Sequence, residues 1–181
     1  MAIFLDASTP DFEARFSDLL SAKREVSEDV DATVRDIIER VRFEGDEALI
    51  DYTGRFDRFD LTAETLRIGA GEIADAVQSV GQQAIDTLSF SRDRIRAHHE
   101  RQRPSDEHYT DPIGAELGWR WTAVESTGLY VPGGTASYPS SLLMNAVPAR
   151  VAGVERIVMT VPTPDGRLNP LVLAAARVAG I

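Results

Sequence analysis

The spacing of apolar residues divides the chain into a helical first part and a second part in which strands and helices alternate. Between residues 12 and 103, apolar side chains recur every three or four positions. This spacing predicts amphipathic helices at about 12–20, 30–41, 46–56 and 71–103. By contrast, Leu66-Arg67-Ile68 is typical of a short strand.

The helical period is lost after Pro104. β-forming residues punctuated by glycines predict two or three strands within residues 113–131. His108 is expected in a loop before them. Trp119 and Trp121 share one strand face by their spacing of two, and we expect them to pack against the helices.

Strands and helices then alternate over residues 128–181. Ser140 or Ser141 is expected to cap a helix that runs to about Ala152, and Pro148 should kink it or mark its restart. A continuous apolar strand at 156–161 follows, then a turn at 162–166, and then a final helix capped by Asn169. This order predicts an α/β fold with a parallel sheet and right-handed crossovers.

The glycine-containing loop after the first of these strands is the strongest candidate for a binding site. Pro132, Gly133 and Gly134 offer backbone N–H groups at the carboxyl end of a strand, where parallel sheets bind ligands. Tyr130, just before the loop, could stack on a ring or could be a core aromatic. The spacing matches neither of the two common nucleotide-binding glycine motifs, so on spacing alone a plain turn is favoured.

Composition and charge narrow the function classes. Residues 1–111 hold 14 Lys and Arg against 25 Asp and Glu, whereas residues 112–181 hold 5 against 4. The acidic first part disfavours nucleic acid and anionic membrane surfaces as partners. The chain has no cysteine, which excludes disulfides and thiolate metal sites. It also lacks an apolar run long enough to span a membrane and a signal-like start, so we expect a cytoplasmic protein.

The three histidines do not form a metal-binding or catalytic pattern. His98 and His99 are adjacent, so on a helix they point about 100° apart, and His108 is separate from both. A serine nucleophile lacks support too, because no GxSxG motif is present. We therefore expect the three histidines to be surface residues.

Several longer stretches resemble one known family. They are GLYVPGG at residues 128–134, YPSS at 138–141, MNAVPARVAGV at 144–154, and upstream VRFEGDEAL at 41–49 and YTGRFD at 52–57. Together these stretches resemble the N-terminal portion of histidinol dehydrogenase. The resemblance covers nearly the whole chain and roughly the first two-fifths of the family's usual length.

The resemblance implies an activity and a fold. The family oxidises L-histidinol to L-histidine through an aldehyde, in two NAD-dependent steps. Its members are zinc-containing homodimers with two incomplete Rossmann-like domains. Carried over to this chain, residues 1–127 would be a helix-rich part with short strands, and 128–181 the start of a Rossmann-like NAD-binding domain. Tyr130 would contact NAD, and Pro132, Gly133 and Gly134 would shape its cleft.

The resemblance also implies what this chain lacks. The family's zinc ligands and its Glu-His base pair lie after the matched region, so we expect the isolated chain to be inactive. Two alternatives stay open. One is a related zinc- and NAD-dependent dehydrogenase of another polar alcohol. The other is a non-catalytic binding or dimerisation module, which would need a closed core. A sheet of two parallel strands, with no strand after the last helix, would expose apolar surface, as expected of a truncated chain or of one that needs a partner.

Overall fold

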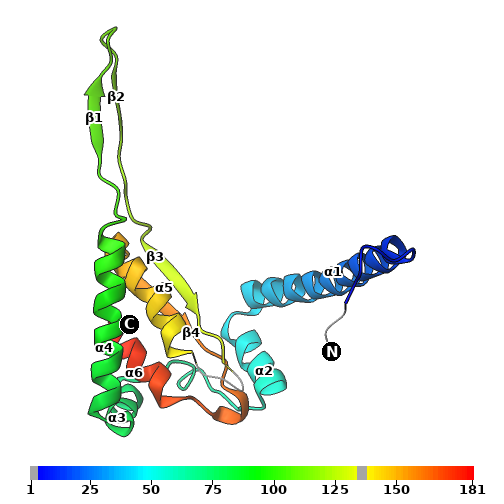
Figure 1. Cartoon of the computed structure of the whole chain (residues 1–181). Helices are drawn as coiled ribbons and strands as arrows, with labels where there is room; N and C mark the ends of the chain where they lie inside the picture. The colour runs from blue at the N-terminus through cyan, green and yellow to red at the C-terminus, as the bar shows by residue number, and fades with distance from the viewer. Residues whose placement is uncertain (1–3, 134–137) are drawn as a thin grey trace. The chain divides into compact units, whose positions relative to one another are not determined.

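The computed structural model describes residues 4–133 and 138–181, and for residues 22–29 the backbone alone (Figure 1). The described chain forms two compact units, Met1–Tyr52 and Thr53–Ile181. Each unit is considered by itself. The second unit contains the parallel sheet and all of the candidate site.

The first unit is dominated by one long helix. α1 runs without a break over Phe12–Glu44, so the two helices predicted here are a single helix. Gly45 ends it with a φ of 65° and donates its N–H to the Val41 carbonyl oxygen at 2.9 Å. α2 (Asp46–Asp57) starts directly after this glycine and crosses the boundary between the units.

Two expectations about the helical part of the second unit are wrong. The predicted helix at 71–103 is two helices, α3 (Ala70–Val80) and α4 (Gln82–Glu100), because Gly81 adopts a φ of 76° between them. The predicted strand at Leu66 to Ile68 does not form. The Thr62 and Thr65 hydroxyls each accept the other residue's backbone N–H, and this local turn removes the segment from any sheet.

An antiparallel hairpin follows α4. β1 (Glu107–Thr110) pairs with β2 (Glu116–Trp119), so His108 lies in a strand and not in a loop. The expected packing of Trp119 and Trp121 on helices is wrong, because both side chains are about half exposed or more. Trp119 instead meets the edge of Tyr109 on the neighbouring strand, with ring centroids 6.4 Å apart.

The parallel sheet and the α/β fold are confirmed. β3 (Ser126–Tyr130) and β4 (Arg156–Thr160) are parallel, with Ser126 opposite Arg156 and Tyr130 opposite Thr160. The crossover helix α5 (Pro139–Ala152) continues through Pro148. It starts before Ser140, so neither predicted serine is its cap. A 3₁₀ turn, η1 (Pro164–Gly166), leads into α6 (Pro170–Ala179).

The core of the second unit lies between its helices. α5 and α6 pack against each other, α4 packs on both, and α3 packs on α6 (Figure 1). Ile157 faces the buried side of the sheet, whereas Tyr130 and Val158 are on the exposed face. The cluster of buried side chains consists of Leu88, Val131, Leu142, Leu143, Ala146, Val147, Val172, Ala174, Ala175, Ala176 and Ala179.

Candidate functional site

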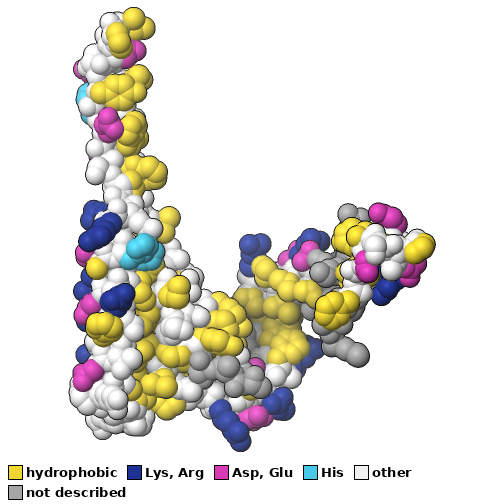
Figure 2. Space-filling model, in the orientation of Figure 1, with side chains coloured by type: hydrophobic (Ala, Val, Ile, Leu, Met, Phe, Trp, Pro, Cys, Tyr) yellow, Lys and Arg dark blue, Asp and Glu magenta, His cyan; other side chains and the backbone are white. Residues whose placement is uncertain are grey.

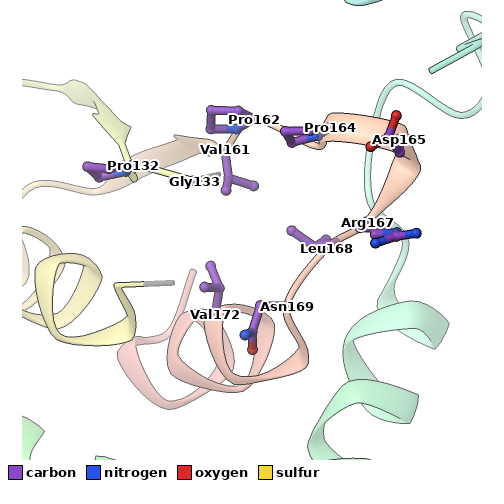
Figure 3. A pocket seen from close by; sticks show the side chains of 10 residues that line it. All are labelled: Pro132, Gly133, Val161, Pro162, Pro164, Asp165, Arg167, Leu168, Asn169 and Val172. Atoms are coloured by element: carbon purple, nitrogen blue, oxygen red, sulfur yellow. The ribbon is translucent and has the colours of Figure 1, made fainter. Parts of the chain in front are cut away.

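A cavity of about 580 Å³ lies where the two parallel strands end (Figure 3). Its volume falls in the usual range of small-molecule sites, about 300–1,000 Å³. One wall comes from the loop after β3 and the other from the segment that joins β4 to α6. The lining residues are Pro132, Gly133, Val161, Pro162, Pro164, Asp165, Arg167, Leu168, Asn169 and Val172. The cavity therefore occupies the place where parallel sheets bind ligands.

Gly133 lies where the loops after β3 and β4 approach each other closely. A Cβ atom at this position would lie 3.0 Å from the Pro162 carbonyl oxygen and 3.3 Å from its Cδ. A larger residue would push the loops after β3 and β4 apart. The glycine thus has a steric reason in the structure, and the backbone next to the cavity stays open to a ligand.

The start of α6 forms the lower wall in Figure 3. Asn169 caps this helix as predicted, since its Oδ1 accepts the Leu171 N–H at 2.8 Å. Val161 and Val172 point toward each other across the cavity, and Asp165 and Arg167 lie at the end away from Pro132 (Figure 3). An apolar middle with charged groups at one end suits a ligand that has a flat ring and polar substituents.

Asp165 supplies a fixed negative charge at that end. Its Oδ1 accepts a hydrogen bond from Arg58 Nε at 2.7 Å. This hydrogen bond has the largest effect and lowers the pKa of the Asp165 carboxyl below its ordinary value. Desolvation raises the pKa in part, and attraction to Arg58 and Arg167 lowers it again. Asp165 is therefore ionised at neutral pH.

The four residues proposed from the sequence as cofactor-binding do not all line the cavity. Pro132 and Gly133 line the cavity. Tyr130 ends β3 with its side chain 64% exposed on the open face of the sheet, and it is not a lining residue. Gly134 lies outside the described residues.

The sequence analysis did not identify the segment that joins β4 to α6 as part of the site. Residues 162–166 were interpreted only as a turn, although they follow the second parallel strand at its carboxyl end. The rule that singled out the first loop applies equally to this one. Applied to both strands, it would have indicated Asp165, Arg167 and Asn169.

The histidines form no metal site. The His98 and His99 rings meet edge to face, and His98 Nε2 is 3.3 Å from the Gln102 amide nitrogen. His108 Nε2 is 3.9 Å from a Glu116 oxygen at the exposed hairpin. Among the side chains that the structure describes, those of residues 4–21, 30–133 and 138–181, no three His, Cys, Asp or Glu gather so that they could hold a metal ion. These residues therefore do not fit a zinc site.

No helix in the described part of the chain is long and apolar enough to cross a membrane.

Comparison with known proteins decides the family. The family model described as histidinol dehydrogenase matches residues 20–181. The chain belongs to the histidinol dehydrogenase family. The resemblance inferred from the glycine- and proline-containing stretches is thereby confirmed.

Curated members of the histidinol dehydrogenase family match along the entire chain. The chain is 65% identical to the histidinol dehydrogenase of Mesorhizobium japonicum and 59% identical to that of Bradyrhizobium diazoefficiens, each over 181 residues. It spans 42% of the length of both relatives.

A solved structure of the histidinol dehydrogenase family has the same fold. The crystal structure of histidinol dehydrogenase from Elizabethkingia anophelis matches with a TM-score of 0.78 at 30% identity. The match covers 84% of this chain and 35% of that one.

Proposed function

We propose that this chain forms part of the NAD site of a histidinol dehydrogenase, an enzyme that oxidises L-histidinol to L-histidine in two NAD-dependent steps. The observation that carries the proposal is the cavity at the carboxyl ends of β3 and β4, in a chain that belongs to this family. NAD would accept the hydride in each step. The residues described here would bind the cofactor and orient it.

Each wall of the cavity has a separate role in this proposal. Pro132 and Gly133 shape one side, and Gly134 continues the same loop. Tyr130, on the exposed face at the end of β3, is free to contact the cofactor from outside the cavity. The start of α6 presents the positive end of a helix dipole, which favours an anionic group nearby. Pro170 has no N–H, and the Leu171 and Val172 N–H groups donate to Asn169, so the dipole and not free donors would supply this attraction.

Proton transfer and substrate binding would use residues that lie beyond the part matched here. The described residues contain no ligand set for the zinc ion that the family uses. We therefore expect the isolated chain to bind the dinucleotide without oxidising L-histidinol. Assembly as a homodimer in the cytoplasm belongs to the same proposal.

The test measures cofactor binding and turnover separately. Isothermal titration of the purified chain with NAD should give saturable binding, and Gly133→Val should weaken it about tenfold or more, because the side chain would push the two walls apart. Gly54→Ala is the matched control, since a Cβ atom there would meet nothing within 4 Å. Absence of binding by the wild-type chain would refute an NAD site in it. NADH formation from L-histidinol, with zinc supplied, would refute the expected inactivity.

A further inference from the structure

The last residue of α2 and the residue after it contact the β4–α6 loop, which lines the cavity. Asp57 Oδ2 accepts a hydrogen bond from the Thr163 backbone N–H at 2.8 Å. The next residue, Arg58, donates from Nε to Asp165 at 2.7 Å. Both bonds join residues more than a hundred positions apart in the sequence, at separations of 106 and 107.

A third contact lies beside these two. Gly166 has a φ of 68°, and a Cβ atom there would lie 2.8 Å from Phe59 Cδ2. The Phe59 ring therefore lies directly over the Gly166 backbone. Three consecutive residues therefore contact the β4–α6 loop. Asp57 bonds to Thr163, and Arg58 bonds to Asp165. Phe59 packs against Gly166.

The backbone of this contact is strained on both sides. In the described part of the chain, Arg58 and Asp165 are the non-glycine residues with positive φ, at 53° and 55°. L-residues avoid this conformation, and it persists where surrounding contacts impose it. That the two strained residues are partners in one ion pair indicates that the contact itself fixes both segments.

Asp57 is poorly placed for any role within its own helix. It is the last residue of α2, where a negative charge opposes the helix dipole. Its carboxylate instead accepts the N–H of Thr163, which belongs to the loop and lies next to the cavity-lining residues Pro162 and Pro164. Neither Asp57 nor Arg58 lines the cavity.

The position of the loop controls the width of the cavity. Pro162, Pro164, Asp165 and Arg167 all line it. The Pro162 carbonyl oxygen also lies close to Gly133 at the end of the neighbouring strand, where a Cβ atom on Gly133 would be 3.0 Å from it. Movement of the loop by a fraction of an ångström would open or close this contact.

We propose that Asp57 and Arg58 are positioning residues, which hold the β4–α6 loop in the conformation that forms the cavity and thereby set its affinity for a nucleotide ligand. The nature of the ligand rests on the proposed function. The holding of the loop does not, because it follows from contacts within the chain.

The experiment compares loop opening with ligand binding in the purified chain. The variants are Asp57→Ala, Arg58→Ala and Asp57→Asn, which keeps an oxygen acceptor for Thr163. Arg96→Ala is the control, since Arg96 also forms an exposed ion pair, with Asp93 at 3.6 Å within α4, and neither residue lines the cavity. Amide hydrogen exchange of residues 162–169, titration with NAD and the thermal unfolding midpoint are measured for each.

Asp57→Ala should speed exchange of residues 162–169 about tenfold, as expected for loss of a hydrogen bond to a charged group, and weaken NAD binding by a similar factor. Arg58→Ala should have a smaller effect of the same kind. Asp57→Asn should restore most of both properties, and Arg96→Ala should change neither. The unfolding midpoint of Asp57→Ala should fall by a few degrees, because the lost contact is absent from the opened and the unfolded states alike.

The two proposals fail in different ways. If the wild-type chain binds no NAD but Asp57→Ala still speeds exchange of the loop alone, the NAD site is refuted and the positioning role stands. If exchange of residues 162–169 is unchanged in Asp57→Ala and Arg58→Ala, the positioning role is refuted. It is refuted as well if the loop opens while NAD binding stays unchanged.

Discussion

The α5–α6 layer and the β1–β2 hairpin contain the same kinds of side chain in opposite surroundings. Leu142, Leu143 and Val172 are almost completely removed from solvent between the helices. In the hairpin, Tyr109, Leu117 and Trp119 share one face of the ladder, and each remains at least 44% exposed. Hydrophobic side chains gather along one side of the hairpin in Figure 2.

The difference shows that burial, and not residue type, decides what an apolar side chain contributes. A buried side chain gains the full transfer free energy and close packing. A two-stranded hairpin has no second layer to cover its apolar face, so it gains little. The stability of the second unit should therefore come from α3 to α6 and hardly at all from β1 and β2.

The largest predicted effect contrasts two leucines. Leu142→Ala should lower the free energy of unfolding by about 2–5 kcal/mol, because it removes buried methyl groups and leaves a cavity. Leu117→Ala, in the hairpin, should change it by no more than about 0.5 kcal/mol. Urea unfolding of both variants measures the two values. Equal losses would contradict the division into a stabilising layer and a hairpin of little energetic weight.

The second prediction concerns a glycine that packs against an aromatic ring. Gly166→Ala should cost about 2 kcal/mol, because a non-glycine residue is strained at a φ of 68° and its Cβ would lie 2.8 Å from Phe59 Cδ2. Gly54→Ala should stabilise α2 by about 0.5–1 kcal/mol, because its Cβ meets nothing and alanine favours the helix. Thermal unfolding should move the two midpoints in opposite directions. A shift in the same direction for both would show that the contact around Gly166 gives way at little cost.

Periodicity predicted the second unit well where the pattern was strong. The alternation over residues 128–181 is confirmed, including the Asn169 cap. These features depend on short-range chemistry, which the local sequence contains. The break of the predicted helix at Gly81 was missed, because the apolar period continues on both sides of it and only the backbone angle interrupts the helix.

The candidate site was only half predictable, for a related reason. Pro132 and Gly133 follow a strand and contain a glycine signal, so the sequence points to them. Asp165 and Arg58 are 107 positions apart, and no local pattern connects them. In the hairpin the sequence predicted too much burial. The alternation of apolar and polar residues predicts one buried face, but no described residue covers it. The proposed division of the chain after residue 127 remains a prediction.

The third prediction tests a small contribution inside the buried layer. Asn169→Ala should cost about 1 kcal/mol, because the Leu171 N–H loses its acceptor at the start of α6. Asn169→Asp should preserve most of the stability, since a carboxylate caps equally well. Urea unfolding distinguishes the two variants. If alanine and aspartate gave the same loss, the cap would not be the reason for asparagine here.

The smallest effect on stability is expected from the exposed ion pair between Arg58 and Asp165. The hydrogen bond from Arg58 lowers the pKa of the Asp165 carboxyl, so the contribution of the pair is present above about pH 4 and is lost as the pH falls through the lowered pKa. Arg58→Ala should raise the pKa of Asp165 back toward its ordinary value. Arg96→Ala, which breaks a pair with Asp93, should leave the titration of Asp165 unchanged. The carboxyl-carbon NMR signal of Asp165 measures this pKa directly.

Because both partners are about half exposed or more, the unfolding midpoint at neutral pH should hardly change in Arg58→Ala. A loss comparable to that of Leu142→Ala would mean that exposed contacts at the cavity carry as much stability as the buried layer, and the contrast between the two regions would then be wrong.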